Sequence, residues 1–537
     1  MLDVDVLVIG SGFAGSLMAL ALRRSGQRVA MLERDRHPRF AIGESSTPLA
    51  NLLLEELADR YDLPDIRSLS KWGTWQHAHP EVACGLKRGF TFLFHRPGQP
   101  FSDTDTHERQ LLVAASPHDA VADTHWYRPD FDHWLVRQAE EAGVVYLDET
   151  RIDSLTVEGG RWRVDATRRG QSVRIDAGFL IDASGPRGAL FRVLSLGEHP
   201  CRWLPATEAL YTHFQDVDLW EDVCTPGQTP PYPPDAAALH HVFPGGWIWI
   251  LRFNNGITSA GAALARPLAQ RLGTSATDAA WDRLLDTLPS VRRQFHRARP
   301  TRPFVHAPEL AFRSAQIAGP GWALLPSAAG VIDPLLSTGF PLTLLGILRL
   351  LEALTDHGAG PARDALLRAY ARTTSDELDA TERLVAALYA TMADPPLFKR
   401  LTLLYFAAVS FSEAARRLHR HAQAPGFLLH GLHRFGPEFV ACTSLGLGSP
   451  QGRERAALLA RIARLIAPFD IAGLLDRSRL DWYPVLASDL VAGAGKLGAG
   501  AEEVYELLAR SGFVTVAGGA SRHISTTRAS GPTTNSA

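Results

Sequence analysis

The stretch VDVLVIGSGFAGSLMALALRRSG, residues 4–26, decides the fold of this chain. It begins with apolar residues typical of a buried parallel strand, passes through the glycine-rich turn GSGFAG at 10–15, and ends in a helical pattern. A strand, a glycine turn and a helix in this order form the phosphate-binding part of a dinucleotide-binding unit. The sequence therefore predicts an α/β fold of the Rossmann type, with a dinucleotide cofactor near its amino terminus.

Each glycine of this turn has a separate role in the motif. Gly10 permits the tight turn, Gly12 lets the backbone approach a pyrophosphate, and Gly15 lets the helix pack on the strand. Phe13 and Ala14 lie in the same turn, where the dipole of the helix favours a phosphate group. We expect all five residues to contact or shape the cofactor site.

The chain after the second strand indicates a flavoprotein. The strand RVAMLE ends in Glu33, where a carboxylate is expected to bind a ribose hydroxyl of the cofactor. An NAD dehydrogenase would continue into a second βαβ unit, whereas this chain inserts RDRHPRFAIGESSTP at 34–48. The segments FLIDASG at 179–185, which contains Asp182, and GWALLPSAAGVIDPLLSTGF at 321–340 are expected to return to the same cofactor. The predicted cofactor is therefore FAD.

Composition and charge restrict the class of protein further. The 537 residues are 46% hydrophobic and 21% charged, and the net charge of −2 provides no general attraction to nucleic acid or anionic membranes. Four widely spaced cysteines and 20 scattered histidines show neither a disulfide pattern nor a metal-binding spacing. The chain has no secretory signal pattern and no run of about 18 uncharged apolar residues. We expect a cytoplasmic protein without metal, nucleic-acid partner or membrane span.

The pattern of strands and helices divides the chain into five regions. The predicted ranges are an FAD-binding region at 1–200 with an inserted segment at 40–125, a mostly antiparallel sheet that covers the substrate at 201–320, a return to the FAD site at 321–350, a helical region at 351–515, and a polar, disordered tail at 516–537. Within the helical region, the aromatic cluster Tyr405, Phe406 and Phe411 is expected in the core.

Six segments share their order and spacing with one known family. They are GSGFAG at 10–15, IGESSTP at 42–48, ACGLKRGFTFLFH at 83–95, YRPDFDHWL at 127–135, GGWIWIL at 245–251 and LLPSAAGVIDPLLSTG at 324–339. Together they resemble the flavin-dependent halogenases, and most closely the branch that acts on free phenolic compounds. The resemblance fades beyond about residue 350 and implies a hydroxylase-type FAD fold.

The resemblance also implies the reaction and its reagents. Reduced FAD from a separate flavin reductase, O2, and chloride or bromide would yield hypohalous acid, which halogenates an electron-rich arene such as a phenol or resorcinol. Two alternatives stay open at this point. One is an FAD-dependent monooxygenase or dehydrogenase of the same fold, and the other is a non-catalytic flavin-binding partner protein.

In this family the lysine of the ACGLKRGF stretch is catalytic, and Lys87 occupies it here. Only four of the 55 basic residues are lysines, so arginine is the usual cation of this chain. An ammonium can polarise hypohalous acid, or its neutral amine can be halogenated, whereas guanidinium stays charged. Phe90, three residues later, is predicted to contact the substrate. The alternative for Lys87 is a strand-end lysine that points into water.

Two further segments supply candidates near the flavin. Glu44 is predicted to orient the lysine as a second catalytic residue, and Ser45 to contact the cofactor, although capping of the following helix explains the hydroxyls of this segment equally well. Arg128 resembles the arginine that related flavoproteins keep beside FAD, with a surface ion pair as the alternative.

The segment at 324–339 is predicted to bind halide and cofactor. Backbone amides of Thr338 and Gly339 stand at a helix start, where a halide would bind by resemblance, and Asp333 shapes the same turn next to the flavin. In GGWIWIL, Trp247 and Trp249 share one face of a strand and are predicted to face the substrate, with a core stripe as the alternative.

Four residues, at three places in the chain, depart from the patterns of related flavoproteins. Arg252 stands where the tryptophan motif of the halogenases continues into proline, and Val331 stands where phenylalanine is common. Pro326 and Ser327 replace the glycine and aspartate that flavin hydroxylases use, which disfavours a hydroxylase.

Overall fold

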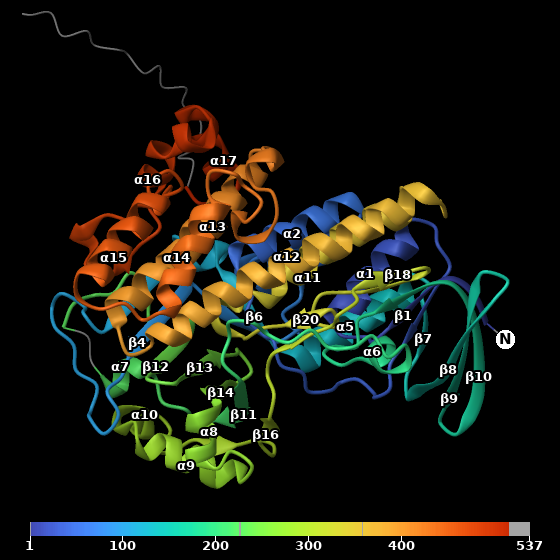
Figure 1. The fold of residues 1–537 in the computed structure, drawn as a ribbon, viewed down its shortest axis with the longest axis horizontal. Helices are drawn as coiled ribbons and strands as arrows, with labels where there is room; N and C mark the ends of the chain where they lie inside the picture. The colour runs from blue at the N-terminus through green and yellow to red at the C-terminus, as the bar shows by residue number, and fades with distance from the viewer. Residues whose placement is uncertain (1, 225–226, 357, 515–537) are drawn as a thin grey trace, which may run out of the picture.

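The computed structural model describes residues 2–224, 227–356 and 358–514, so the predicted tail at 516–537 lies outside the described residues. Two sheets and a group of helices make up the molecule (Figure 1). In that view the first sheet lies at the right and the second at the lower left, with the orange and red C-terminal helices above the second sheet.

The first sheet holds the glycine-rich turn. Strand β1 lies at its centre and pairs in parallel with β2 and β10, and β19 continues the parallel arrangement beyond β10. Strands β8 and β9 form an antiparallel hairpin, and β9 pairs antiparallel with β10. The strands are β1 (Leu2–Ile9), β2 (Val29–Leu32), β7 (Val145–Leu147), β8 (Thr150–Glu158), β9 (Arg161–Arg168), β10 (Gln171–Asp182), β18 (Ala318–Gly319) and β19 (Trp322–Leu324).

Helix α1 (Phe13–Arg24) follows β1 directly and packs against α5 (Arg128–Glu141) and α11 (Gly339–Thr355). The inner residues of β1 are branched and apolar and are buried, as is typical of a parallel strand covered on both faces. The predicted Rossmann-type α/β fold is therefore confirmed.

The second sheet is mostly antiparallel, as predicted, and has the strand order β15-β11-β14-β13-β12-β4-β5-β21, with β16 paired to β11. Only the β12–β4 and β21–β5 pairs are parallel. The strands are β4 (Gly89–Phe94), β5 (Gln110–Ala114), β11 (Thr207–Gln215), β12 (Ala238–Phe243), β13 (Gly246–Arg252), β14 (Thr258–Ala265), β15 (Arg299–Pro300), β16 (Val305–Ala307) and β21 (Trp482–Tyr483).

This sheet takes its strands from three separate parts of the chain. The inserted segment supplies β4 and β5, the predicted substrate region supplies β11 to β16, and the helical region supplies β21. The second sheet is therefore not formed by one contiguous range of the chain. The predicted domain boundaries stay a prediction.

Two short two-stranded ribbons are separate from the two sheets. In the first, β3 (Cys84–Lys87) pairs antiparallel with β6 (Asp123–Trp126). In the second, β17 (Phe312–Arg313) pairs with β20 (Gly330–Val331). Because the first ribbon carries the lysine of the ACGLKRGF stretch at its end, it decides where that side chain lies.

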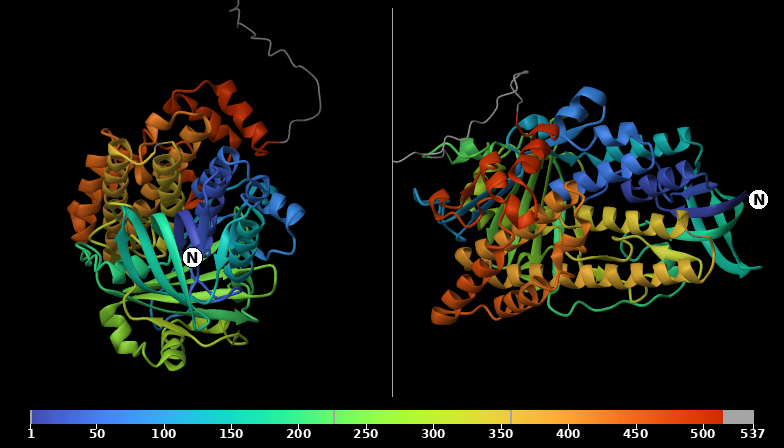
Figure 2. Two further views of the ribbon diagram at one scale, coloured as in Figure 1. Left: turned by 90° about the vertical axis from the view of Figure 1, so that its right-hand side faces the viewer. Right: turned by 90° about the horizontal axis from the view of Figure 1, so that it is seen from above.

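The C-terminal region is helical, as predicted. Helices α11 and α12 pack against each other and run along the molecule (Figure 2), and α11 also contacts α1 and α2. Beyond α11, the helices are α12 (Pro361–Thr391), α13 (Pro395–Arg417), α14 (Gly436–Leu447), α15 (Gly452–Ile466), α16 (Ala487–Ala492) and α17 (Ala501–Arg510). The earlier helices are α2 (Pro48–Arg60), α3 (Pro64–Ser68), α4 (Trp72–Ala78), α6 (Ala189–Val193), α7 (Trp220–Val223), α8 (Arg266–Leu272), α9 (Thr277–Asp286) and α10 (Pro289–Gln294).

One segment, Leu335–Thr355, is long and apolar enough by length and composition to cross a membrane. Arg349 interrupts its apolar run, and 72% of the apolar window is buried inside the protein. The core helix of a globular protein passes the same test, so this segment is weak support for a membrane span.

Candidate active site

The geometry of the glycine-rich turn requires its first and third glycines. Gly10 has a φ of 98°, and a Cβ there would lie 2.7 Å from the backbone of Ala183. A Cβ on Gly15 would lie 1.9 Å from the carbonyl oxygen of Gly10. Strand β1 and helix α1 can therefore approach only through glycine at these two positions.

Two arginines face the open side of this turn. A Cβ on Gly12 would lie 3.4 Å from the guanidinium of Arg128 and 3.7 Å from that of Arg39. Helix α1 begins at Phe13 without a side-chain cap, so its first amides are free to donate to a ligand. Amides at a helix start and two guanidinium groups fit a pyrophosphate, as in FAD.

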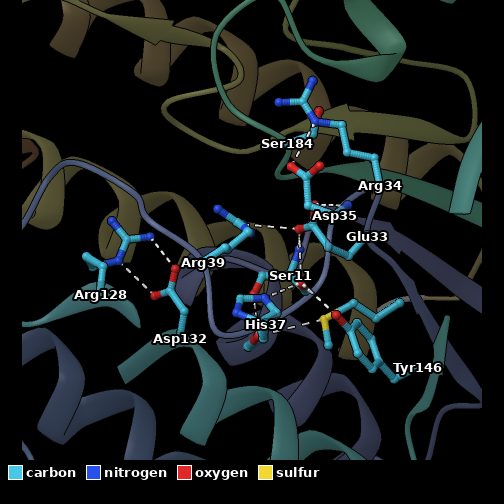
Figure 3. Close-up of polar contacts among 12 residues, drawn as sticks. Ser11, Glu33, Arg34, Asp35, His37, Arg39, Arg128, Asp132, Tyr146 and Ser184 are labelled. Atoms are coloured by element: carbon cyan, nitrogen blue, oxygen red, sulfur yellow. Dashed lines mark hydrogen bonds and ion pairs between the residues drawn. The ribbon is translucent and has the colours of Figure 1, made fainter. Parts of the chain in front are cut away.

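Arg128 is buried beside the turn and forms an ion pair there. Its guanidinium donates to both carboxylate oxygens of Asp132, at 2.8 and 2.7 Å, and to the carbonyl oxygens of Ile42 and Gly43 at 2.9 and 2.8 Å. Figure 3 shows this pair and Arg39 around the turn that carries Ser11. The ion pair is therefore buried beside the glycine-rich turn and does not lie on the outer surface.

Glu33 lies at the end of β2, as predicted. Its carboxylate accepts from the backbone amide and the hydroxyl of Ser11, at 3.1 and 3.0 Å, and from Arg39 at 3.1 Å (Figure 3). Although burial opposes it, the nearby Arg39 and the Ser11 amide hold the pKa of Glu33 below its usual value. The side chain is thus ionised, as the predicted acceptor for a ribose hydroxyl requires.

Asp182 ends β10 next to the same turn. One oxygen accepts from the amide of Ser184 at 2.8 Å, and the other accepts from the amide of Leu190 at 2.7 Å. Burial raises the pKa of Asp182, while these hydrogen bonds lower it. Both carboxylate oxygens accept hydrogen bonds from backbone amides that follow β10, so the geometry favours a structural role for Asp182.

The loop before α11 has an unusual backbone. Leu336 and Ser337 have φ values of 66° and 54°, and each left-handed residue other than glycine costs about 1–3 kcal/mol. Thr338 is buried, whereas Gly339 is exposed and has open space where a Cβ would be. Helix α11 begins here without a side-chain cap, so the amides at its start are free.

Lys87 is fully buried, which excludes the alternative of a lysine in water. Its Nζ donates to the hydroxyl of Ser45 at 2.9 Å and to the carbonyl oxygen of Ser46, and lies 3.8 Å from the ring centroid of Phe90. Ser45, predicted as a cofactor contact, thus holds the lysine. Of the hydroxyls in this segment, that of Thr47 caps α2 by accepting from the Ala50 amide at 3.3 Å.

Asp123 is a buried carboxylate that the sequence did not single out. It pairs with Lys87 in the register of β3 and β6, and one of its oxygens accepts from the Asn51 amide nitrogen at 2.7 Å. Asn51 in turn accepts from the Ser46 hydroxyl. The second Asp123 oxygen is buried and has no hydrogen-bond partner among the described residues.

The two buried charges shift each other's protonation. Burial lowers the pKa of Lys87, and Asp123 partly restores it. Burial raises the pKa of Asp123, and Lys87 opposes that rise. No sequence motif marks Asp123, because only the antiparallel pairing of β3 with β6 brings it opposite the lysine.

Glu44 does not reach Lys87, contrary to the prediction that it orients the lysine. Within the described chain its carboxylate accepts from His213 of β11 at 2.8 Å, while its other oxygen is buried without a partner. The backbone explains this outcome, because Ser45 pairs with His125 of β6 and side chains of neighbouring extended residues point to opposite sides. His213 also lines an open cleft of about 650 Å³ together with Tyr127, Pro129, Gln215, Ile257, Arg299, Pro300, Thr301 and Arg302.

The two tryptophans of GGWIWIL lie in the protein interior. Trp247 donates from its indole nitrogen to the Tyr389 hydroxyl at 3.2 Å, and Trp249 donates to the Ser259 hydroxyl at 3.4 Å. The Tyr389 hydroxyl donates to Asp333 at 2.8 Å. Burial raises the pKa of Asp333 to about 7, against these hydrogen bonds. The geometry favours the core interpretation for both tryptophans.

An apolar cavity of about 130 Å³ lies beside Phe90. This size matches a single aromatic ring, because an apolar cavity of about 150 Å³ accommodates benzene. Its wall includes Tyr405, Phe406 and Val409 of α13, Leu490 of α16, and Val504 and Leu508 of α17. Tyr405 and Phe406 are buried in the hydrophobic core, as expected, and they also line this cavity.

The two departures from the halogenase pattern have structural roles. Arg252 donates to Asp235 at 2.8 Å and to the carbonyl oxygen of Val217 at 2.9 Å, so it joins β13 to the neighbouring loops. Val331 pairs with Phe312 in the β17–β20 ribbon. No group of three or more His, Cys, Asp or Glu side chains suited to a metal ion occurs in the part of the chain that the structure describes.

Known proteins similar to this chain are flavoenzymes. A family model described as FAD dependent oxidoreductase matches residues 5–332. The monodechloroaminopyrrolnitrin halogenase PrnC of Pseudomonas fluorescens is 31% identical over 401 residues, which cover 73% of this chain and 68% of that protein. The tetracycline 7-halogenase of Kitasatospora aureofaciens is 31% identical over 417 residues, which cover 75% of this chain and 73% of that protein.

A solved structure agrees over most of the fold. The crystal structure of the halogenase PltM in complex with phloroglucinol and FAD has a TM-score of 0.79 and 27% sequence identity, and the match covers 89% of this chain and 99% of that one. Because this share exceeds the part of the chain before residue 350, the match reaches into the C-terminal helical region, where the sequence resemblance had faded. The family predicted from the six segments is thereby confirmed, and FAD-dependent halogenation is favoured over the two alternatives. This chain belongs to the FAD-dependent oxidoreductases and, within them, to the flavin-dependent halogenases.

Proposed function

We propose that this chain halogenates a small, electron-rich arene such as a phenol or resorcinol, with reduced FAD supplied by a separate flavin reductase. One observation carries the substrate class. The same Phe90 ring lies under the Lys87 ammonium and lines an apolar cavity of one-ring size. A ring in that cavity would lie against Phe90, the residue that also contacts the Lys87 ammonium. A phloroglucinol-bound relative is consistent with a phenolic substrate.

Reduced FAD, when bound, would supply the two electrons with which O2 oxidises chloride or bromide to hypohalous acid, with oxidised FAD and water as the other products. We assign the pyrophosphate to the turn of Gly10, Gly12 and Gly15 with Arg39 and Arg128, and the ribose to Glu33. We assign the halide to the free amides at the start of α11, at Thr338 and Gly339. A small anion at a helix start interacts favourably with the helix dipole.

Lys87 would hold the hypohalous acid and activate it. Its ammonium donates a proton to the leaving hydroxyl while the halogen bonds to a ring carbon, and the neutral amine then takes the proton that the ring carbon loses. The sum is arene plus hypohalous acid to halogenated arene plus water. The lowered pKa of Lys87 favours such a cycle near neutral pH, and Asp123 stands opposite as the group that keeps the proton on the amine.

All four cysteines are free in the structure, which fits the predicted reducing cytoplasm. Access to the flavin is assigned to the open cleft beside His213, which opens next to Tyr127 and Pro129 at the start of α5.

The first test uses the holoenzyme with chemically reduced FAD, O2, bromide and phloroglucinol. We expect bromide-dependent bromination by the wild type, and oxidation of bromide but less than about 1% of the arene bromination in Lys87→Ala and Lys87→Arg, given the 10²–10⁴-fold typical of proton-transfer groups. Lys496→Ala, at an exposed lysine, is the control.

Mass spectrometry of the product and a soluble trap for hypobromous acid separate the outcomes. Bromination by Lys87→Ala at the rate of the control would remove Lys87 from the mechanism. A hydroxylated product formed without bromide would replace halogenation with monooxygenation.

A further inference from the structure

The loop from Asp333 to Gly339, here called the halide loop, holds two strained residues in sequence. Leu336 and Ser337 both have left-handed φ values. Such a conformation persists only when surrounding groups hold it in place. The contacts that hold this loop therefore decide where the amides at the start of α11 point.

Two tyrosines from the C-terminal helices hold the halide loop. Tyr389 of α12 donates its hydroxyl to the Asp333 carboxylate at 2.8 Å. Tyr405 of α13 donates its hydroxyl to the Leu336 carbonyl oxygen at 2.8 Å. Both side chains are buried, and both follow residue 332, where the match to the family model ends.

Tyr405 also lines the apolar cavity beside Phe90, whereas Tyr389 is not among the lining residues. The Tyr405 ring lines it together with Phe90 and Phe406. The ring centroids of Tyr405 and Phe406 are 5.2 Å apart, and those of Phe406 and Phe90 are 5.1 Å apart. Tyr405, which holds the carbonyl oxygen of the strained residue Leu336, is thus also part of the wall of this apolar cavity, here called the arene cavity.

We propose that Tyr405 is a positioning residue that couples occupation of the arene cavity to the conformation of the halide loop. An arene against the Tyr405 ring restricts its movement and keeps its hydroxyl on Leu336, so the amides of Thr338 and Gly339 stay aligned. Because coupling between two sites is reciprocal, halide and arene each bind more tightly when the other is present. The role assigned to the loop rests on the proposed function.

The test compares Tyr405→Phe with Tyr483→Phe. Tyr483 lines the same cavity, and within the described chain its hydroxyl makes no hydrogen bond to the halide loop, so it is the matched control. In the FAD-loaded enzyme with phloroglucinol, Tyr405→Phe is expected to raise the KM for bromide by about fivefold to tenfold, as for the loss of one buried hydrogen bond. Because the coupling is reciprocal, the KM for phloroglucinol at saturating bromide is expected to rise by a similar factor, whereas the Kd of FAD stays within about twofold of wild type.

A second readout does not depend on halogenation. Amide hydrogen exchange of the peptide at 333–340, in FAD-loaded protein, is expected to be faster in Tyr405→Phe than in wild type or Tyr483→Phe. Phloroglucinol is expected to slow this exchange in wild type and in Tyr483→Phe, but not in Tyr405→Phe.

The two readouts separate the possible failures. Equal exchange and equal bromide KM in the two tyrosine variants would overturn the coupling role of Tyr405. A wild type that oxidises no bromide would overturn the proposed function, while the exchange experiment would still decide whether Tyr405 holds the loop.

Discussion

Lys87 and Asp123 form a buried pair whose charges depend on each other. The register of β3 and β6 sets them opposite, and Ser46 and Asn51 complete a set of hydrogen bonds around them. A buried lysine without a counter-charge loses its proton easily, because burial disfavours the charged form. At the scale of the residue, the chemistry of the lysine is therefore set by a carboxylate that lies 36 positions further along the chain.

The first prediction concerns this pair. Asp123→Asn removes the charge that raises the pKa of Lys87, so that pKa falls further. If the ammonium activates the hypohalous acid, the basic limb of the bromination rate moves to lower pH, and the loss of rate is larger at pH 8 than at pH 6. The pH–rate profile with phloroglucinol measures this shift.

Asp119→Asn, at an exposed aspartate, is the control for this substitution. An Asp123→Asn profile that superimposes on that of the control would show that Lys87 does not depend on Asp123.

At the scale of the element, helix α13 has two functions that its sequence does not separate. One face lines the arene cavity through Tyr405, Phe406 and Val409, and the opposite side packs in the core through Phe411. The helix also contacts α2, which follows the loop that holds Lys87. A change at Val409, which within the described chain makes no hydrogen bond to the halide loop, should therefore alter the proposed arene site without altering the cofactor site.

The second prediction fills the cavity. Val409→Phe adds a ring to a space of about 130 Å³, so phloroglucinol no longer fits well. We expect kcat/KM for phloroglucinol to fall at least about tenfold, which corresponds to about 1.4 kcal/mol of lost binding. Bromide oxidation in the absence of arene should stay unchanged, as followed with the hypobromous acid trap.

Val440→Phe on α14 is the matched control, because Val440 is 40% exposed and lies away from the cavity lining. Equal kcat/KM for the two variants would mean that the arene binds elsewhere.

At the scale of the whole molecule, the second sheet buries histidines as neutral groups. Burial lowers the pKa values of His240 and His241 to about 3. The ring of His240 stacks on that of Phe92, with 4.5 Å between the ring centroids. The ring nitrogens of His241 form hydrogen bonds with His95 at 2.9 Å and with Gln294 at 3.0 Å. The folded protein thus binds fewer protons at these positions than the unfolded chain.

The third prediction follows from this difference. The pKa of histidine in the unfolded chain is about 6.5, so stability is lost as pH falls below that value and continues to fall toward pH 3. Each of the two histidines is expected to lower the free energy of unfolding by about 2 kcal/mol between pH 7 and pH 5. Urea denaturation at both pH values measures the change.

His240→Phe should reduce this pH dependence, whereas His419→Gln at an exposed position should leave it as in wild type. A His240→Phe protein with the full pH dependence would contradict the assignment.

The sequence by itself determined the cofactor half of this protein. The predicted cofactor site depends on a strand, a turn and a helix that follow one another along the chain. Its residues, Gly10, Gly12, Gly15 and Glu33, therefore form a pattern that is visible in the sequence. The prediction that Lys87 is catalytic also came from the sequence, through the family resemblance.

Only the tertiary structure decided what surrounds that lysine. Asp123 lies opposite it because β3 pairs with β6, Glu44 turns instead to His213, and the cavity wall comes from α13, α16 and α17. These contacts join residues far apart in sequence, and a polar or aromatic residue carries no local pattern that says which distant partner it meets. Packing across the two sheets and the C-terminal helices sets those partners, and with them the cavity that we propose for the arene.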